Sequence, residues 1–388
     1  MKRIYYVLFF YIFIAGLGLL SFRSLMSHYI NDEEDLHEWV PELGSKLETD
    51  IDNNFFRQFD FVNFNGFMAR IIGKHELNGV IKLDNGYLTV PSPYYEDEEI
   101  ADRMDQVIAL NGYLEKKGIP FIFTITPNTS GKYDPQLPVY AEDPGNDNLD
   151  RIAEALRAGG VNVIDYRDEL QEDGLDAYDM MYRTDHHWNT KMGFYAYCKI
   201  ADILEDELDC TIDPQVKDIE SYTIRTYKRW HLGSRGQRTG KYYGGVDDFD
   251  LIVPEFETSL TECESEREGG YRDLLVDTDS LRKKDLTLAR NDINERSIYD
   301  RVLECSQGDY VNHLSANDKK ILITGDSFAK AVCPFMDISF ANVRWDEGPV
   351  EEYDIIMFEP DAVVMIYDLA DNLLTEDFDY EWTYQAEI

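Results

Sequence analysis

The chain has 388 residues, 44% of them hydrophobic and 13% aromatic, which is enough for one large domain or two ordinary ones with a packed core. This composition excludes wholesale disorder. The 76 acidic residues outnumber the 37 lysines and arginines and give a net charge of −39, so the surface repels nucleic acids and we expect no nucleic-acid partner.

The N-terminal residues predict a membrane anchor. The run from Ile4 to Phe22 carries no charge and follows Lys2 and Arg3. A helix of this length rises about 28 Å, close to the thickness of a bilayer's hydrocarbon core. The two basic residues place its start in the cytoplasm. A cleavable signal peptide is the alternative, but its apolar region is normally shorter and no small-x-small cleavage site follows. We expect a single-pass signal anchor over 1–25 in the cell membrane, with the rest of the chain extracytoplasmic.

Residues 26–95 are expected to form a linker and a small β element. The stretch from Phe61 to Val90 predicts short strands and turns, because Asn-Gly and Asp-Asn-Gly turns separate apolar runs.

An alternation of helices and strands then predicts the main fold. Apolar residues recur at helical spacing within 100–118, 149–160 and 194–204. Buried-looking strands are expected at 121–126, at 161–166, up to Thr324, at 340–345 and at 362–367.

Apolar strands separated by helices predict an α/β domain over 96–388, with a parallel sheet covered by helices on both faces. Between 213 and 315 the pattern lapses into a polar, loop-rich insertion, with a helix expected around 281–298.

The five cysteines are irregularly spaced and odd in number. This is neither a zinc pattern nor a dense disulfide framework. A Cys263–Cys305 bridge and five unpaired thiols both remain open.

Two motifs, one directly after a predicted strand and one before a predicted helix, together predict a catalytic proton relay. Gly325-Asp326-Ser327 comes directly after a strand, where active sites of open α/β sheets gather. A serine hydroxyl needs a base and a group that orients the base. The segment Asp185-His186-His187-Trp188 offers an imidazole and, two residues before it, a carboxylate.

Each motif also has a simpler interpretation. Gly-Asp-Ser is a common turn, and Asp-His-His can cap the following helix with Trp188 in the core. Asp185 and His187 are also suitable metal ligands, although none of the other five histidines lies in a comparable cluster. We expect no metal and no cofactor.

At these residues the chain resembles the DHHW proteins and the extracytoplasmic alginate O-acetyltransferases of the SGNH hydrolase superfamily. The resemblance rests on "TDHHWN" followed, after a gap, by a strand and "GDSF", and it covers roughly residues 60–370. It implies an SGNH-like (flavodoxin-like) fold in which the two catalytic motifs occur in permuted order. It also implies that Ser327 is the nucleophile, His187 the base and Asp185 its orienting partner, with His186 at a variable position.

The chain departs from that family after the first strand, at "TPNTSGKYDPQLP". Asn128 stands near the family's lysine position, while Tyr133 matches its tyrosine. Asn128 is either an oxyanion donor or a structural residue after Pro127. The glycine-rich, basic stretch from His231 to Gly245 is expected either to line a carbohydrate groove through Arg235, Arg238, Lys241 and the paired tyrosines, or to be a loop paired with acidic residues.

The leading hypothesis is a membrane-anchored O-acetyltransferase that acts on a secreted or cell-surface polysaccharide. The resemblance implies a membrane-bound O-acyltransferase partner that supplies the acetyl group. The rivals are an SGNH-type acetyl-esterase and a non-catalytic glycan-binding or assembly protein. A DHH-type metallophosphoesterase would need upstream aspartate motifs and usually a cytosolic setting, and the sequence offers neither.

Overall fold

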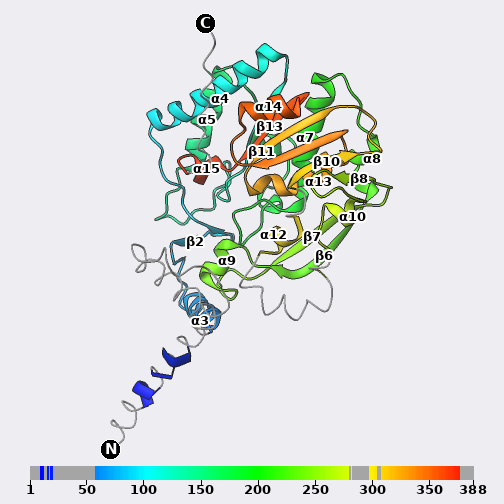
Figure 1. Ribbon diagram of the computed structural model, residues 1–388. Coiled ribbons are helices and arrows are strands. Elements are labelled where there is room, and N and C mark those ends of the chain that lie inside the picture. The colour runs from blue at the N-terminus through cyan, green and yellow to red at the C-terminus, as the bar shows by residue number, and fades with distance from the viewer. Residues whose placement is uncertain are drawn as a thin grey trace, which may run out of the picture.

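The computed structural model describes residues 9–12, 15–16, 18–20, 57–278, 281, 297–303 and 307–375 (Figure 1). Across these described parts, no helix combines the length and the apolar character needed to cross a bilayer. The expected anchor, the spacer before residue 57 and most of the expected helix at 281–298 lie outside the described residues.

The core of the fold is an eight-stranded mixed sheet in the order β5-β4-β13-β11-β12-β10-β8-β9. Its first five members run parallel to their neighbours. They are β5 (Asn162–Asp165), β4 (Phe121–Ile125), β13 (Ala362–Tyr367), β11 (Lys320–Gly325) and β12 (Asn342–Glu347). The five strands expected from the sequence are therefore present, and the expected α/β architecture is confirmed.

The sheet is not parallel throughout, which corrects the sequence expectation. An antiparallel extension joins β12 and consists of β10 (Gly308–Asn312), β8 (Leu260–Glu262) and β9 (Arg267–Gly269). These strands are short and polar, and they come from the segment expected to be loop-rich. These strands pair because β10 adds to the edge of β12 and β8 and β9 follow in turn. Their own sequences carry no hydrophobic pattern that predicts a strand.

The same segment also contains a long two-stranded sheet. Strand β6 (Tyr222–His231) pairs antiparallel with β7 (Asp247–Pro254). Most residues of β6 are exposed, whereas the end of β7 is buried. Because β6 is mostly polar, its sequence lacks the apolar alternation that predicts a strand. The expectation that 213–315 is loop-rich was therefore wrong.

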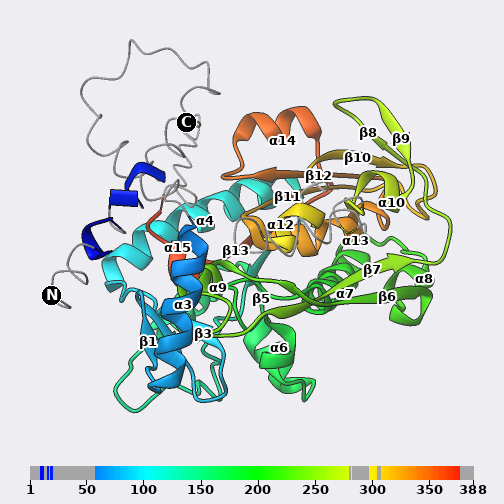
Figure 2. The same cartoon turned by 90° about the horizontal axis from the view of Figure 1, so that it is seen from below.

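Helices cover both faces of the central sheet, as expected. Successive residues of a strand pack into two separate hydrophobic cores, one on each face of the sheet. Ile321 and Ile323 belong to one core and Leu322 to the other. The first core contains α7 and α13, and the second contains α4, α5, α14 and α15. Figure 2 shows α14 and α7 on opposite sides of β11 and β12.

The expected helices occur close to their expected positions. Gly118 ends α4 in the left-handed conformation that glycine favours. The helices of the domain are α4 (Asp97–Lys117), α5 (Gly145–Ala158), α6 (Tyr166–Glu172), α7 (Thr190–Glu207), α8 (Pro214–Lys217), α9 (Ser234–Thr239), α10 (Tyr271–Leu274), α12 (Ile298–Leu303), α13 (Cys333–Asp337), α14 (Glu352–Phe358) and α15 (Leu369–Asn372), with 3-10 turns η1 (Ala177–Met180), η2 (Ile219–Ser221) and η5 (Ser327–Ala331).

The small β element is only partly as expected. Strands β1 (Glu76–Leu77), β2 (Val80–Lys82) and β3 (Leu88–Thr89) form a separate antiparallel sheet. Residues 58–71, expected to contribute strands, instead form the helix α3 (Gln58–Ile71). The β propensity of its aromatic residues is overridden because its small residues pack against α9.

The described cysteines are unpaired. Cys198, Cys210, Cys263 and Cys333 are free thiols, and Cys263 lies 3.3 Å from a carboxylate oxygen of Asp309. Cys305 lies outside the described residues. The structure therefore favours unpaired thiols over a bridge at Cys263.

Close packing of α7 on the segment after β11 gives a testable stability effect. A Cβ added at Gly193 would lie 2.4 Å from the carbonyl oxygen of Ala331. We expect Gly193→Ala to lower the free energy of unfolding by roughly 1–3 kcal/mol through overpacking. Gly112→Ala is the control, because nothing lies within 4 Å of its added Cβ; removing a helical glycine there should stabilise by about 0.5–1 kcal/mol. Denaturant titration of both variants measures the difference, and equal effects would contradict this packing.

Candidate active site

Ser327 stands at the carboxyl end of β11, on a turn held by Asp326. One carboxylate oxygen of Asp326 accepts a hydrogen bond from the Phe328 N–H (2.9 Å), and the other accepts one from the Asp368 N–H (2.8 Å). Because Asp368 follows β13, the same side chain ties two neighbouring strand ends together. Ser327 is half-buried and lines a pocket of about 440 Å³.

The Asp-His-His-Trp segment forms a short loop before α7. Met181 and Trp188 close it through an antiparallel β-bridge. The cap of α7 is Asn189, whose side chain accepts hydrogen bonds from two backbone N–H groups, so the loop's acid and histidines are not needed as caps. Trp188 is fully buried, and its indole N–H donates to the carbonyl oxygen of Phe328 at 3.0 Å. The tryptophan thus docks the histidine loop onto the residue after Ser327.

The loop brings His187 against Ser327. His187 Nε2 lies 2.6 Å from Ser327 Oγ, although 140 positions separate the two residues. Tyr299, from α12, stacks on the imidazole with ring centroids 4.4 Å apart, and its hydroxyl donates to the Ser327 carbonyl oxygen at 3.0 Å. The imidazole is therefore held between an aromatic ring and the serine hydroxyl.

Asp185 lies behind His187 and is shared by several donors. Its Oδ2 is 3.4 Å from His187 Nδ1 but 2.8 Å from His231 Nε2. Its Oδ1 accepts the His186 N–H (2.8 Å) and the Ser234 hydroxyl (3.1 Å). Asp185 and His231 are both fully buried. The carboxylate faces His187 Nδ1, but its shorter contact is with His231.

Sequence reasoning missed the roles of His231, Ser234 and Tyr299. The first two come from the glycine-rich stretch, which packs tightly on the loop: a Cβ added at Gly233 would lie 2.2 Å from the Asp185 Cβ. No spacing rule connects these residues to Asp185. Only the glycine content, which permits close backbone approach, signalled that this stretch packs against something.

The electrostatic environment keeps His187 neutral. Burial, and after it the neighbouring His186, lower its pKa to about 4. Burial alone would raise the pKa of Asp185, but its contacts with His187, His186 and His231 hold that pKa well below the usual value. At neutral pH the site therefore holds an ionised carboxylate and a neutral imidazole, which is the form that can accept a proton.

Asp185, His186 and His187 also offer ligand atoms within 4.8 Å of one another, a grouping compatible with a metal ion. However, His187 Nε2 faces Ser327, and both Asp185 oxygens already accept hydrogen bonds. A metal would have to replace these bonds, so the donor set fits a proton relay better.

Comparisons with known proteins show which proteins the chain is similar to. Residues 86–228 match the family model described as "SGNH hydrolase-like domain, acetyltransferase AlgX". The resemblance to AlgX-type SGNH proteins is confirmed. No curated protein matches the chain significantly.

The SGNH-like fold also appears in solved structures. Bacillus cereus PatB1 superposes with a TM-score of 0.60 at 19% identity, covering 78% of this chain and 99% of that one. A second PatB1 structure, with a sulfonyl adduct, gives 0.59 at 18% identity, covering 78% and 97%. A DHHW family protein from Eubacterium siraeum gives 0.54 at 16% identity, covering 78% and 95%. At these identities the likeness establishes the fold alone.

The expected substrate-binding residues lie elsewhere in this SGNH-like domain. Asn128 is buried and bonds to Asp143 (3.2 Å), as the structural alternative predicts. Tyr133 is exposed and donates to Asp168 (2.7 Å). Both line a pocket that shares no residue with the pocket of Ser327. Asn372 is the amide side chain that lines the Ser327 pocket.

Arg235 does not line a surface groove, so that expectation was wrong. Its side chain is 4% exposed and donates to the carbonyl oxygens of Leu88 (3.0 Å) and Asp185 (3.2 Å), and to the Thr129 hydroxyl. The guanidinium is used inside the protein, where it joins β3 to the loop that carries the histidines.

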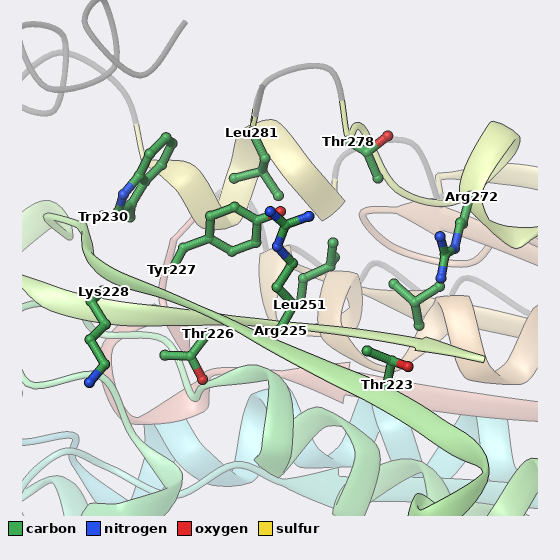
Figure 3. A pocket seen from close by; sticks show the side chains of 11 residues that line it. Thr223, Arg225, Thr226, Tyr227, Lys228, Trp230, Leu251, Arg272, Thr278 and Leu281 are labelled. Carbon is green, nitrogen blue, oxygen red and sulfur yellow. The ribbon is translucent and has the colours of Figure 1, made fainter. Parts of the chain in front are cut away.

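A basic and aromatic groove does exist, on the preceding strand (Figure 3). Its volume is about 960 Å³. Within the described residues, its three cations have no acidic partner, and Arg225 stacks on the ring of Tyr227 at 5.0 Å. The lining residues are Thr223, Arg225, Thr226, Tyr227, Lys228, Trp230, Leu251, Val253, Arg272, Thr278 and Leu281.

The influence of His186 on His187 can be measured directly. In the wild type, we expect the His187 imidazole to titrate well below its usual value of 6.5, near 4. His186→Gln removes a neighbouring positive charge and should move the His187 titration to higher pH. Histidine NMR titration measures both values. A His187 pKa that is unchanged by the substitution would contradict the assigned contribution of His186.

Proposed function

We propose that the protein is a membrane-anchored, extracytoplasmic O-acetyltransferase acting on a polysaccharide. The observation that carries this proposal is the 2.6 Å contact between His187 Nε2 and the half-buried Ser327 Oγ. Support for acetyl transfer as the chemistry comes from the match to the AlgX acetyltransferase family over residues 86–228.

In the proposed mechanism, neutral His187 accepts the Ser327 proton as Oγ attacks the carbonyl carbon of an acetyl donor. The resulting imidazolium, stabilised by ionised Asp185, returns the proton to the leaving group as the acetyl-serine forms. A sugar hydroxyl then attacks the ester while His187 takes its proton. That proton returns to Ser327 Oγ, and the acetylated sugar leaves.

Three parts of this proposal rest on sequence. The anchor over 1–25 places the domain outside the cytoplasm, the segment 26–95 leads into it, and 96–388 forms the catalytic unit with its insertion at 213–315. The resemblance to alginate O-acetyltransferases supports a membrane-bound O-acyltransferase as the source of the acetyl group.

The acceptor is proposed to lie in the groove on β6 and β7. Aromatic rings stack on sugar faces, and unpaired cations attract carboxylate or phosphate groups. The groove residue Trp230 directly precedes His231, which contacts Asp185. A polymer bound in the groove would therefore contact a residue of β6 that is adjacent in sequence to His231, the hydrogen-bond partner of Asp185.

Ser327→Ala should lower acetyl turnover by at least about 10⁴-fold, because it removes the hydroxyl that His187 Nε2 contacts. Turnover is measured with an activated acetyl ester, and a sulfonyl fluoride reports nucleophile labelling by mass spectrometry. Ser265→Ala is the control, since Ser265 is exposed on the β8–β9 turn and its hydroxyl donates a hydrogen bond to Glu262. Full activity of Ser327→Ala would remove Ser327 from the mechanism.

The same assay separates the rival functions. With an acetyl donor and oligosaccharide acceptors, acetylated sugar identifies a transferase, whereas free acetate alone identifies an esterase. Glycan binding without labelling of Ser327 would identify a non-catalytic protein.

The groove assignment predicts an effect on acceptor binding. Arg225→Ala combined with Tyr227→Ala should raise KM for a polymeric acidic acceptor and leave turnover of a small acetyl ester unchanged, because the small ester does not reach the groove. Arg229→Ala is the matched control, since Arg229 lies on the same strand but does not line the groove. An equal KM in wild type and double variant would place the acceptor elsewhere.

A further inference from the structure

Helix α3 presents its small residues to the protein and its large apolar residues to solvent. The buried residues of the helix are Asn63, Gly66 and Ala69. The face they form packs against α9, and the Asn63 side chain accepts a hydrogen bond from the Lys241 N–H at 2.8 Å. This is the reverse of an ordinary surface helix, which buries its large apolar side chains.

The outward face of α3 forms an apolar patch. Spacing of three and four residues places Phe64, Phe67, Met68 and Ile71 along one stripe of the helix, and Ile72 follows at its C-cap. Phe67 also meets the exposed Tyr242 edge-on, with ring centroids 6.3 Å apart. The members and their exposed fractions are Phe64 (63%), Phe67 (44%), Met68 (41%), Ile71 (61%), Ile72 (70%) and Tyr242 (48%).

Cations surround this α3 patch in a chain whose net charge is −39. Arg70 and Lys74 are exposed and, within the described residues, have no acidic partner. Lys241 lies over the ring of Tyr242, 5.5 Å from its centroid. Burial, then Arg70 and Arg183, lower the pKa of the nearby Lys82, which shows that positive charge gathers here.

We propose that the α3 patch lies in the headgroup region of a bilayer that contains anionic lipids. Aromatic and aliphatic side chains flanked by lysine and arginine are the features of helices that lie in a membrane interface. A symmetric contact between two copies of the patch fits poorly, because it would bring the exposed cations Arg70 and Lys74 of both copies together.

The expected anchor supports this occupant. Only 34 residues, 23–56, separate the end of the apolar run from the start of the described domain. Even fully extended they span at most about 3.3–3.6 Å each, so α3 stays near the membrane at high local lipid concentration. Contact through α3 would set the orientation of the domain, and thus of the Ser327 pocket, relative to the bilayer.

The test uses the full chain in vesicles of phosphatidylcholine and phosphatidylglycerol, with an environment-sensitive fluorescent amino acid at position 64 or 72. Lipids brominated on their upper acyl chains should quench this probe several-fold more than a probe at position 353 or 356. Tyr353 (64% exposed) and Ile356 (55%) lie on α14, at the opposite end of the domain (Figures 1 and 2). Equal quenching at the two ends would overturn the proposal.

A charge variant tests the lipid class. Arg70→Glu combined with Lys74→Glu should reduce the quenching at position 64 in anionic vesicles, and added salt should reduce it in the wild type. Quenching unaffected by either change would overturn the role of anionic lipid. Shielding of position 64 that depends on protein density and not on brominated lipid would assign the α3 patch to a protein contact instead.

Discussion

The candidate active site depends on one contact, the hydrogen bond between His187 Nε2 and Ser327 Oγ. It joins the carboxyl end of β11 to the loop before α7, and neither segment determines the other's position locally. The sheet places Ser327, because Asp326 links the ends of β11 and β13. The core places His187, because the buried Trp188 is bonded to the backbone of Phe328. The contact between His187 and Ser327 is therefore held by the central sheet on one side and by the buried Trp188 on the other.

The buried Asp185 carboxylate is the most demanding feature of this arrangement. A carboxylate removed from water is costly unless hydrogen bonds and opposite charges stabilise its ionised form. His231 and Ser234 provide such bonds from the glycine-rich stretch, and Arg235 donates to the backbone of Asp185. The stretch from His231 to Gly245, for which a carbohydrate groove was one expectation, thus stabilises the ionised form of Asp185 through hydrogen bonds. Gly233 and Arg235 of this stretch pack against Asp185, whereas Arg238 bonds to the Asn78 carbonyl and Lys241 lies over the ring of Tyr242.

Charge distinguishes three parts of the surface: the mostly acidic remainder, the groove on β6 and the surroundings of α3. Most of the chain is acidic, which keeps it soluble and repels polyanions. Among the residues that the structure describes, cations without an acidic partner gather in the groove on β6 and around α3. In both places they accompany aromatic side chains. In a strongly acidic protein, an anionic partner can approach at such positively charged places, and we propose a glycan for the groove and a lipid headgroup layer for the α3 patch.

The sequence by itself predicted the five parallel strands, the helices between them and the proximity of Asp185, His187 and Ser327. Those strands are short apolar runs, which are stable only when buried and are therefore visible in the sequence. The Asp-His-His-Trp and Gly-Asp-Ser motifs are likewise short, continuous segments. Only the tertiary structure decided the rest. His231 and Tyr299 reach the relay from β6 and α12, the polar strands β8 to β10 extend the edge of the sheet, and residues 58–71 fold as a helix whose large side chains face outward. These features depend on contacts between segments far apart in the chain, and local propensity and periodicity carry no information about such contacts.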